Sequence, residues 1–123
     1  MIEGLHHVQL AMPPGGEEAA RGFYAGVLGL TEIGKPPRLA ARGGVWFRGP
    51  GTEVHLGVEA AFAPARKAHP AFRVTALGRM TAHLAACGIA FHPDVDLPGL
   101  RRVFVDDPFG NRIELLELTG DPG

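Results

Sequence analysis

The sequence predicts an α+β fold of two βαβββ modules, whose strands form a curved mixed sheet with the helices on its outer face. Short segments alternate between apolar and polar residues, which is typical of half-buried strands. Two stretches with helical spacing of apolar residues each follow such a strand and end at a glycine. This order occurs twice, at about residues 4–60 and 68–119, so we expect a single domain, 1–123, with two modules.

The first module opens with a predicted strand over residues 5–12, in which His7 and Gln9 share the polar face. A Pro-Pro-Gly-Gly run ends this strand, and two glutamates suit the start of a helix that continues to Gly29. The apolar stripe of that helix consists of Ala20, Phe23, Tyr24, Val27 and Leu28. Three further strands are predicted at 30–33, 45–48 and 53–59, with a Pro/Gly/Arg-rich loop and a Gly-Pro-Gly turn between them.

The second module repeats this order. A strand over residues 69–74 places His69 and Arg73 on one face, and the following helix ends at Gly88. The apolar side of that helix carries Leu77, Met80, Leu84 and Cys87, so a buried, inert thiol is expected. Strands are then predicted at 89–91, 102–105 and 112–118, with a turn over 106–111 between the last two.

When the two modules are aligned, polar residues fall at equivalent positions. Gly29 and Gly88 are 59 residues apart (88 − 29 = 59), and the same offset relates His55 to Glu114. The opening strands align at 62 (69 − 7 = 62), which pairs His7 with His69. If the modules form one sheet, these four side chains line a shared concave surface.

Imidazole and carboxylate groups in this number favour a divalent metal site with coordination positions left open for substrate. A lone histidine on a polar strand face is usually solvent-exposed, and for His55 alone that interpretation is favoured. For His7, His69 and Glu114 together, metal binding is favoured. His6, His83 and His92 are interpreted as structural or surface residues, as are the charges of Arg38, Lys67, Arg101 and Arg102, whereas Arg73 shares a face with His69.

Composition excludes several classes of protein. The chain has 123 residues, a net charge of −1 and 46% hydrophobic residues, which argues against disorder and nucleic-acid binding. No apolar run reaches about 18 residues, and no secretory signal is evident, so neither a membrane span nor export is expected. The single cysteine excludes an internal disulfide, which fits a cytoplasmic location. Serine-hydrolase and phosphate-loop motifs are absent.

Three segments resemble the vicinal oxygen chelate superfamily, which includes glyoxalase I, extradiol dioxygenases, fosfomycin-resistance thiol transferases and bleomycin-binding proteins. They are His7-Val8-Gln9-Leu10, the Phe-Tyr-Ala-Gly-Val-Leu-Gly-Leu run at 23–30, and the Asp-Pro-Phe-Gly-Asn-Arg-Ile-Glu run at 107–114. The resemblance implies a homodimer and metal ligands at His7, His69 and Glu114. It also makes His55 a candidate fourth ligand, where glyoxalase I typically has a carboxylate or amide.

The resemblance therefore implies a glyoxalase-like lyase or isomerase that binds Zn, Ni, Mn, Fe or Co and acts on a small oxygen-rich substrate. Glu114 is the candidate catalytic base, and Gln9, Arg73 and Trp46 are candidate substrate-binding residues. Two alternatives stay open. One is a thiol transferase or an extradiol dioxygenase of the same superfamily. The other is a module that sequesters an antibiotic or another aromatic compound between Trp46, Phe47 and Phe109.

Overall fold

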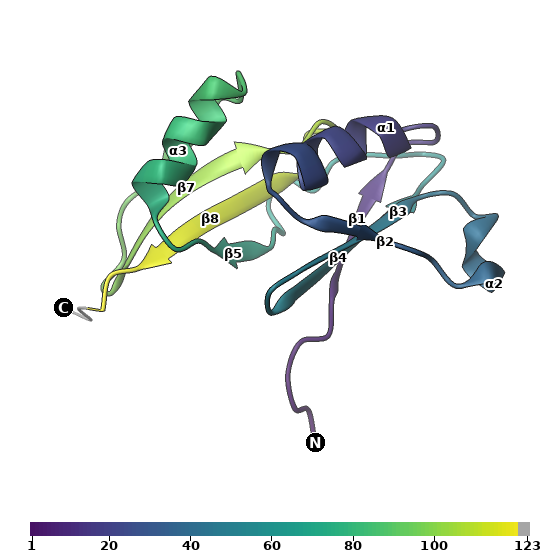
Figure 1. Ribbon diagram of the computed structural model, residues 1–123, viewed down its shortest axis with the longest axis horizontal. Coiled ribbons are helices and arrows are strands. Elements are labelled where there is room, and N and C mark those ends of the chain that lie inside the picture. Colours follow the sequence, from purple (N-terminus) through teal and green to yellow (C-terminus); the bar gives the residue numbers. More distant parts are fainter. Residues whose placement is uncertain (121–123) are drawn as a thin grey trace. The chain divides into compact units, whose positions relative to one another are not determined.

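The computed structural model describes residues 1–120 and has an α+β fold, with two four-stranded mixed sheets (Figure 1). The chain divides into two compact units, the first covering Met1–Ala65 and the second beginning at Arg66. Each unit contains one of the sheets and the helical segments that follow its opening strand. Among the described residues, no helix has the length and apolar character that crossing a membrane requires.

In the first unit the sheet has the order β1-β4-β3-β2. Strands β1 and β4 run parallel, and the other neighbours are antiparallel. The elements in chain order are β1 (Val8–Met12), α1 (Glu17–Ala20), the π-helical segment η1 (Arg21–Val27), β2 (Thr31–Ile33), α2 (Pro37–Ala40), β3 (Val45–Gly49) and β4 (Thr52–Val58). The segment before β1 extends away from its sheet in Figure 1.

The second unit has the equivalent order β5-β8-β7-β6, again with one parallel pair, β5 and β8. Its elements are β5 (Ala71–Arg73), α3 (Leu77–Ala86), β6 (His92–Pro93), β7 (Leu100–Asp106) and β8 (Arg112–Leu118). Helix α3 lies beside β7 and β8 in Figure 1, and a carboxylate of the sheet accepts a hydrogen bond from its first turn. The backbone N–H of Leu77 donates to Glu117 on β8 at 2.6 Å, which satisfies one of the unpaired amides of the first turn.

The two units share one strand register. Gln9 is the Cα partner of His55 in the first sheet, and Ala71 is the partner of Glu114 in the second. In each case the residue two positions before, His7 or His69, is the histidine that the sequence comparison paired. The hydrogen-bond ladders therefore confirm that His55 and Glu114 are equivalent, whereas His7 and His69 both precede the strands that form the ladders.

Several predicted details differ from the structure. The first predicted helix is a short α-turn followed by π-helix, although it does end at a glycine with positive φ, Gly29 at 78°. The predicted strand at 89–91 lies instead at His92–Pro93, and the Pro/Gly/Arg-rich loop contains α2. Cys87 is exposed, because it is the residue that ends α3, beyond the part of the apolar stripe that packs on the sheet. The expectation of a buried thiol is wrong.

Phe47 lies in the apolar core of the first unit, which also holds Met12, Phe23, Val54 and Leu56. Strand alternation on β3 turns Phe47 toward the helical side and Trp46 toward the opposite face. The Phe47 ring stacks on buried Tyr24, with centroids 5.5 Å apart. Phe47 therefore cannot line a binding site on the polar face, contrary to its predicted role as a wall for an aromatic compound.

The turn between β7 and β8 holds a buried acid. Asp107 is 4% exposed, and its carboxylate accepts hydrogen bonds from the backbone N–H groups of Phe109 and Asn111 at 2.9 and 2.8 Å. The side-chain amide of Asn111, itself 1% exposed, donates to the second oxygen at 3.0 Å. These bonds compensate for the loss of water around the acid and set the turn from which β8 begins.

Removing the Asn111 side chain should therefore destabilise the fold. We expect Asn111→Ala to lower the free energy of unfolding by about 1–3 kcal/mol, because a buried carboxylate oxygen loses its donor. Denaturant unfolding measures this difference. The control is Asp106→Ala, at an exposed neighbouring position, with a change within about 0.5 kcal/mol. Equal effects of the two substitutions would contradict this account of the turn.

A second carboxylate joins α1 to the loop before β3. The backbone N–H of Gly44 donates to Glu17 at 2.8 Å, and this bond lowers the pKa of Glu17 below its ordinary value of 4.5. Gly44 has a φ of +85°, and a Cβ there would collide with the carbonyl oxygen of Leu56. The position therefore admits only glycine without a backbone shift.

Because its pKa is lower in the folded chain, ionised Glu17 stabilises the fold above its unfolded-state pKa. That contribution disappears as the pH falls through the folded-state value. Glu17→Gln should lower the melting temperature at pH 7, and its difference from wild type should shrink between about pH 5 and pH 3. Thermal unfolding followed by circular dichroism over this range tests it, with Glu59→Gln, at an exposed position, as the control. A difference that stays constant with pH would refute the interpretation.

Candidate functional site

The polar face of the first unit carries a stack of rings on neighbouring strands. His55 on β4 is the Cα partner of Trp46 on β3, and the two rings stack with centroids 3.7 Å apart. His7 stacks on His55 with centroids 4.1 Å apart. His55 is 5% exposed, whereas sequence analysis favoured solvent exposure for this residue taken alone. The structure therefore brings the predicted ligand His55 into contact with a second predicted ligand, His7, and with the predicted substrate residue Trp46.

Glu53 determines the orientation of the His55 ring. Its carboxylate lies 2.7 Å from Nε2 of His55 and also accepts a hydrogen bond from Arg48 at 3.0 Å. The bond with His55, together with that from Arg48, lowers the pKa of Glu53. Glu53 was not among the residues predicted to form the site. Its place two residues before His55, on the same face of a strand, is the signal that could have identified it.

His7 occupies the segment just before β1, where it is exposed. Its Nδ1 lies 2.9 Å from Nδ1 of His6, so one of these two nitrogens donates to the other. The alternation predicted for a strand over residues 5–12 would place the side chains of His6 and His7 on opposite faces. It does not apply here, because the chain is not yet in the β1 ladder at this point.

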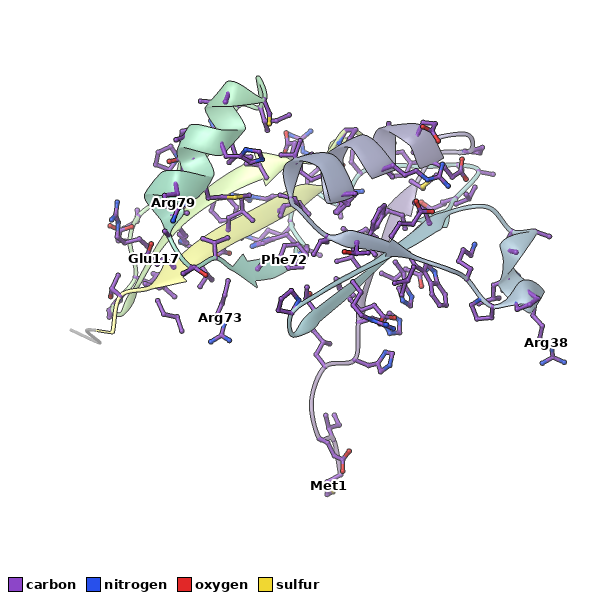
Figure 2. All side chains as sticks on the ribbon, in the orientation of Figure 1. Met1, Arg38, Phe72, Arg73, Arg79 and Glu117 are labelled. Atoms are coloured by element: carbon purple, nitrogen blue, oxygen red, sulfur yellow. The ribbon has the colours of Figure 1, made fainter. Side chains whose placement is uncertain are left out.

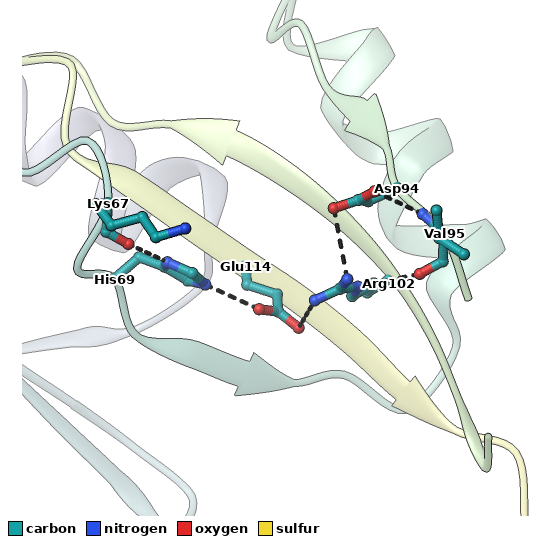
Figure 3. A network of polar contacts seen from close by, with 6 residues as sticks. All are labelled: Lys67, His69, Asp94, Val95, Arg102 and Glu114. Atoms are coloured by element: carbon teal, nitrogen blue, oxygen red, sulfur yellow. Dashed lines mark hydrogen bonds and ion pairs between the residues drawn. The ribbon is translucent and has the colours of Figure 1, made fainter. Parts of the chain in front are cut away.

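In the second unit His69 and Glu114 meet directly (Figure 3). Nε2 of His69 lies 2.9 Å from Oε1 of Glu114, and Nδ1 of His69 lies 2.8 Å from the carbonyl oxygen of Lys67. A carbonyl oxygen can only accept, so Nδ1 carries the hydrogen. In neutral His69, Nε2 then presents a lone pair to a carboxylate oxygen. The contact is therefore favourable only with a proton or a metal cation between the two atoms.

Arg102 contacts the other oxygen of Glu114. Its guanidinium lies 3.6 Å from Oε2 of Glu114 and 3.4 Å from Asp94, and it donates to the carbonyl of Val95 at 3.2 Å (Figure 3). With 18% of its side chain exposed, Arg102 is not the solvated surface charge that sequence analysis expected. It shares a face with Phe104 on β7, the Cα partner of Glu114, and this alternation is the signal that was missed.

Phe104 forms the floor of the second unit's polar face. It is 7% exposed, His69 contacts it edge-on at 5.3 Å, and the guanidinium carbon of Arg112 lies 3.9 Å above its ring. Phe104 and Glu114 thus occupy in this sheet the places that Trp46 and His55 occupy in the first.

The remaining predicted residues lie as follows. Gln9 is exposed on β1 beside His55, and its side chain crosses Gly57, where a Cβ would collide with it. Arg73 is exposed on β5 and extends away from the strand in Figure 2. Phe109 is half-buried in the turn before β8. His83 and His92 are exposed, in agreement with their predicted surface positions.

The donor pair of the second unit suits a divalent metal in part. Nε2 of His69 and Oε1 of Glu114 are 2.9 Å apart. This separation matches the roughly 3 Å between two ligand atoms that each lie about 2.0–2.2 Å from one metal ion at nearly a right angle. The carbonyl of Lys67 anchors the His69 ring as outer-sphere acceptors do in metal sites. Within the described residues, no group of three or more His, Cys, Asp or Glu side chains is arranged to hold an ion.

Comparison with known proteins gives a consistent result. The family model described as the Glyoxalase/Bleomycin resistance protein/Dioxygenase superfamily matches residues 4–115. A crystal structure of a glyoxalase family protein from Bacillus anthracis is 46% identical in sequence, with a TM-score of 0.94, and the match covers 97% of this chain and 98% of that one. No curated protein matches the sequence.

Two further structures are more distant. A glyoxalase/dioxygenase from Nostoc punctiforme is 26% identical, with a TM-score of 0.75 over 98% of this chain and 92% of that one. A fosfomycin resistance protein from Listeria monocytogenes is 19% identical, with a TM-score of 0.77 over 97% and 96% of the two chains. At that identity the likeness concerns the fold alone.

Removing the charge of Arg102 should destabilise the second unit. We expect Arg102→Gln to lower the free energy of unfolding by about 1–3 kcal/mol, because buried Glu114 loses its cationic neighbour. The matched control is Arg101→Gln, at the adjacent exposed position, with an effect within about 0.5 kcal/mol. Urea unfolding of the three proteins compares them, and no excess loss in the Arg102 variant would refute the network.

Proposed function

The chain belongs to the Glyoxalase/Bleomycin resistance protein/Dioxygenase superfamily, and we propose that it is a divalent-metal-dependent lyase or isomerase of the glyoxalase type acting on a small oxygen-rich substrate. The observation that carries this proposal is the contact between His69 and Glu114. It joins two predicted ligands, with the imidazole hydrogen committed to the carbonyl of Lys67. Such a pair is well suited to bind a cation.

The proposed ligand set is His7, His69 and Glu114, with His55 as a candidate fourth ligand. His55 would use Nδ1, because its Nε2 is engaged with Glu53. Each unit supplies two of these donors, so a complete set requires both kinds of unit, from one chain or from two chains of a homodimer. Nitrogen and carboxylate ligands suit Zn, Ni, Mn, Fe or Co.

A bound metal ion would act as a Lewis acid on the paired oxygens of the substrate. The chain's own contribution would be proton transfer and orientation. Glu114 is the proposed base for a proton next to the substrate carbonyl, a role that requires it to leave the metal transiently. Its nearly buried carboxylate is positioned by His69 and by Arg102. Gln9, beside His55 on the polar face, and Arg73, exposed on β5, are proposed to orient the substrate.

The competing proposal of a sequestering protein loses support from the position of Phe47. Of the three aromatic walls it needs, Phe47 is buried in the core, and Trp46 is already stacked on His55. A thiol transferase or a dioxygenase would use the same ligands, so these alternatives differ from the proposal in substrate and metal.

Metal content tests the ligand set. We expect protein purified without chelators to contain a stoichiometric divalent metal by elemental mass spectrometry. His7→Ala and Glu114→Ala should weaken its binding at least about 100-fold, since each removes a ligand. Arg101→Ala, which removes an exposed charge, should retain the metal. Equal metal content in all four proteins would refute the assignment.

Activity separates the reaction classes. The metal-loaded protein should convert a glutathione adduct of a 2-oxoaldehyde in preference to a catechol or to an epoxide supplied with thiol. Glu114→Gln should lower kcat/KM about 100-fold or more, because the base is lost. Turnover of catechol with oxygen uptake, or of the epoxide, would replace the proposed reaction with one of the alternatives.

A further inference from the structure

The polar face of the second unit carries a second arginine besides Arg102, and the two differ in their surroundings. We infer that Arg112 forms an anion-binding subsite, which takes a carboxylate, phosphonate or phosphate group of the substrate. This inference rests on the proposed function, since it assigns a chemical class to the substrate of the same site. Four observations support it.

The first observation is that Arg112 and Glu114 lie on the same face of β8. Arg112 opens β8 two residues before Glu114, so the two side chains leave the same face of the strand. A group bound by Arg112 would therefore lie on the side of the sheet that carries the proposed base and ligand.

The second observation is the support beneath the guanidinium. Its carbon lies 3.9 Å above the ring of Phe104, within the distance for a cation–π contact. Phe104 is 7% exposed and is held between strands as the Cα partner of Glu114 and of His92. A planar guanidinium resting on a fixed ring keeps its N–H edges available, and those edges match the two oxygens of an anion.

The third observation is the contrast with Arg102. Arg102 also lies near Phe104, at 5.3 Å, but its nitrogens are committed to Glu114, Asp94 and the carbonyl of Val95. Its charge is compensated by two carboxylates, so it has little capacity for a further anion. Arg102 acts on Glu114, whereas Arg112 retains its donors.

The fourth observation concerns the charge of Arg112 itself. Its Cα partner across the ladder is Asp106, yet the guanidinium leans toward Phe104. Among the described residues no carboxylate lies within ion-pair distance of Arg112. A half-buried arginine with an aromatic support and no carboxylate partner is suited to an anionic ligand.

The experiment uses methylphosphonate and acetate as probes, with acetamide as the uncharged match for acetate. Each is titrated into the ¹⁵N-labelled full chain after metal removal, and the arginine Nε–Hε signals are followed by NMR together with the backbone amide signals of β8, which report binding in the variants that lack the Arg112 side chain. The variants are Arg112→Gln, Arg112→Lys and Arg73→Gln, with Arg101→Gln as the control. The Arg112 signal is assigned by its absence from the spectrum of Arg112→Gln.

We expect the Arg112 signal to shift along a saturable curve with both anions and not with acetamide. Arg112→Gln should weaken binding about tenfold or more, and Arg112→Lys should weaken it less, because charge is kept and the planar fork is lost. Arg101→Gln should bind as wild type does, and Arg73→Gln should weaken binding less than Arg112→Gln does. An unshifted Arg112 signal, or binding lost in Arg73→Gln and retained in Arg112→Gln, would overturn the subsite.

Metal removal separates this test from that of the proposed function. If the metal analysis shows that the protein binds no divalent metal and anions still bind at Arg112, the subsite is supported and the metal-dependent reaction is refuted. Metal binding without any anion effect at Arg112 would keep the reaction and remove the subsite.

Discussion

The parallel pairing of the first and last strands in each unit is the constraint on which the rest of the structure depends. It places Gln9 beside His55 and Ala71 beside Glu114, in the same register in both sheets. A shift of one residue would turn the polar set of a strand toward the core, so the apolar faces of these strands fix the register firmly. Through this pairing His69 meets a carboxylate 45 positions away in the chain.

The same framework holds different chemistry in the two units. In the first, the central position is His55, enclosed between two rings and bonded to Glu53, which gives an aromatic stack with a carboxylate at its edge. In the second, the central position is Glu114, a nearly buried acid with an imidazole on one oxygen and a guanidinium near the other. Such an acid is stable only with cationic or hydrogen-bonding partners, and both are present.

The arginines of the second unit illustrate how context separates residues of one type. Arg101 is exposed, Arg102 is committed to two acids, and Arg112 rests on Phe104. These roles follow from which face of the strand each residue occupies and from what lies across the ladder. The polar face therefore combines a neutralised acid with an arginine available to a ligand.

The sequence by itself determined the class of fold, the order of the strands within each repeat, the helical segment that follows each opening strand, and the equivalence of His55 with Glu114. Hydrophobic periodicity and glycine positions are local properties, so they can be read along the chain. Only the tertiary structure decided which side chains Arg102 and Glu53 contact, that His6 contacts His7, and that Phe47 packs on Tyr24 in the core. Those outcomes depend on which strands become neighbours and where each ladder begins. Residues that contact each other across a sheet are not separated by any fixed number of positions along the chain. A pattern over a few neighbouring residues therefore cannot indicate which of them will meet.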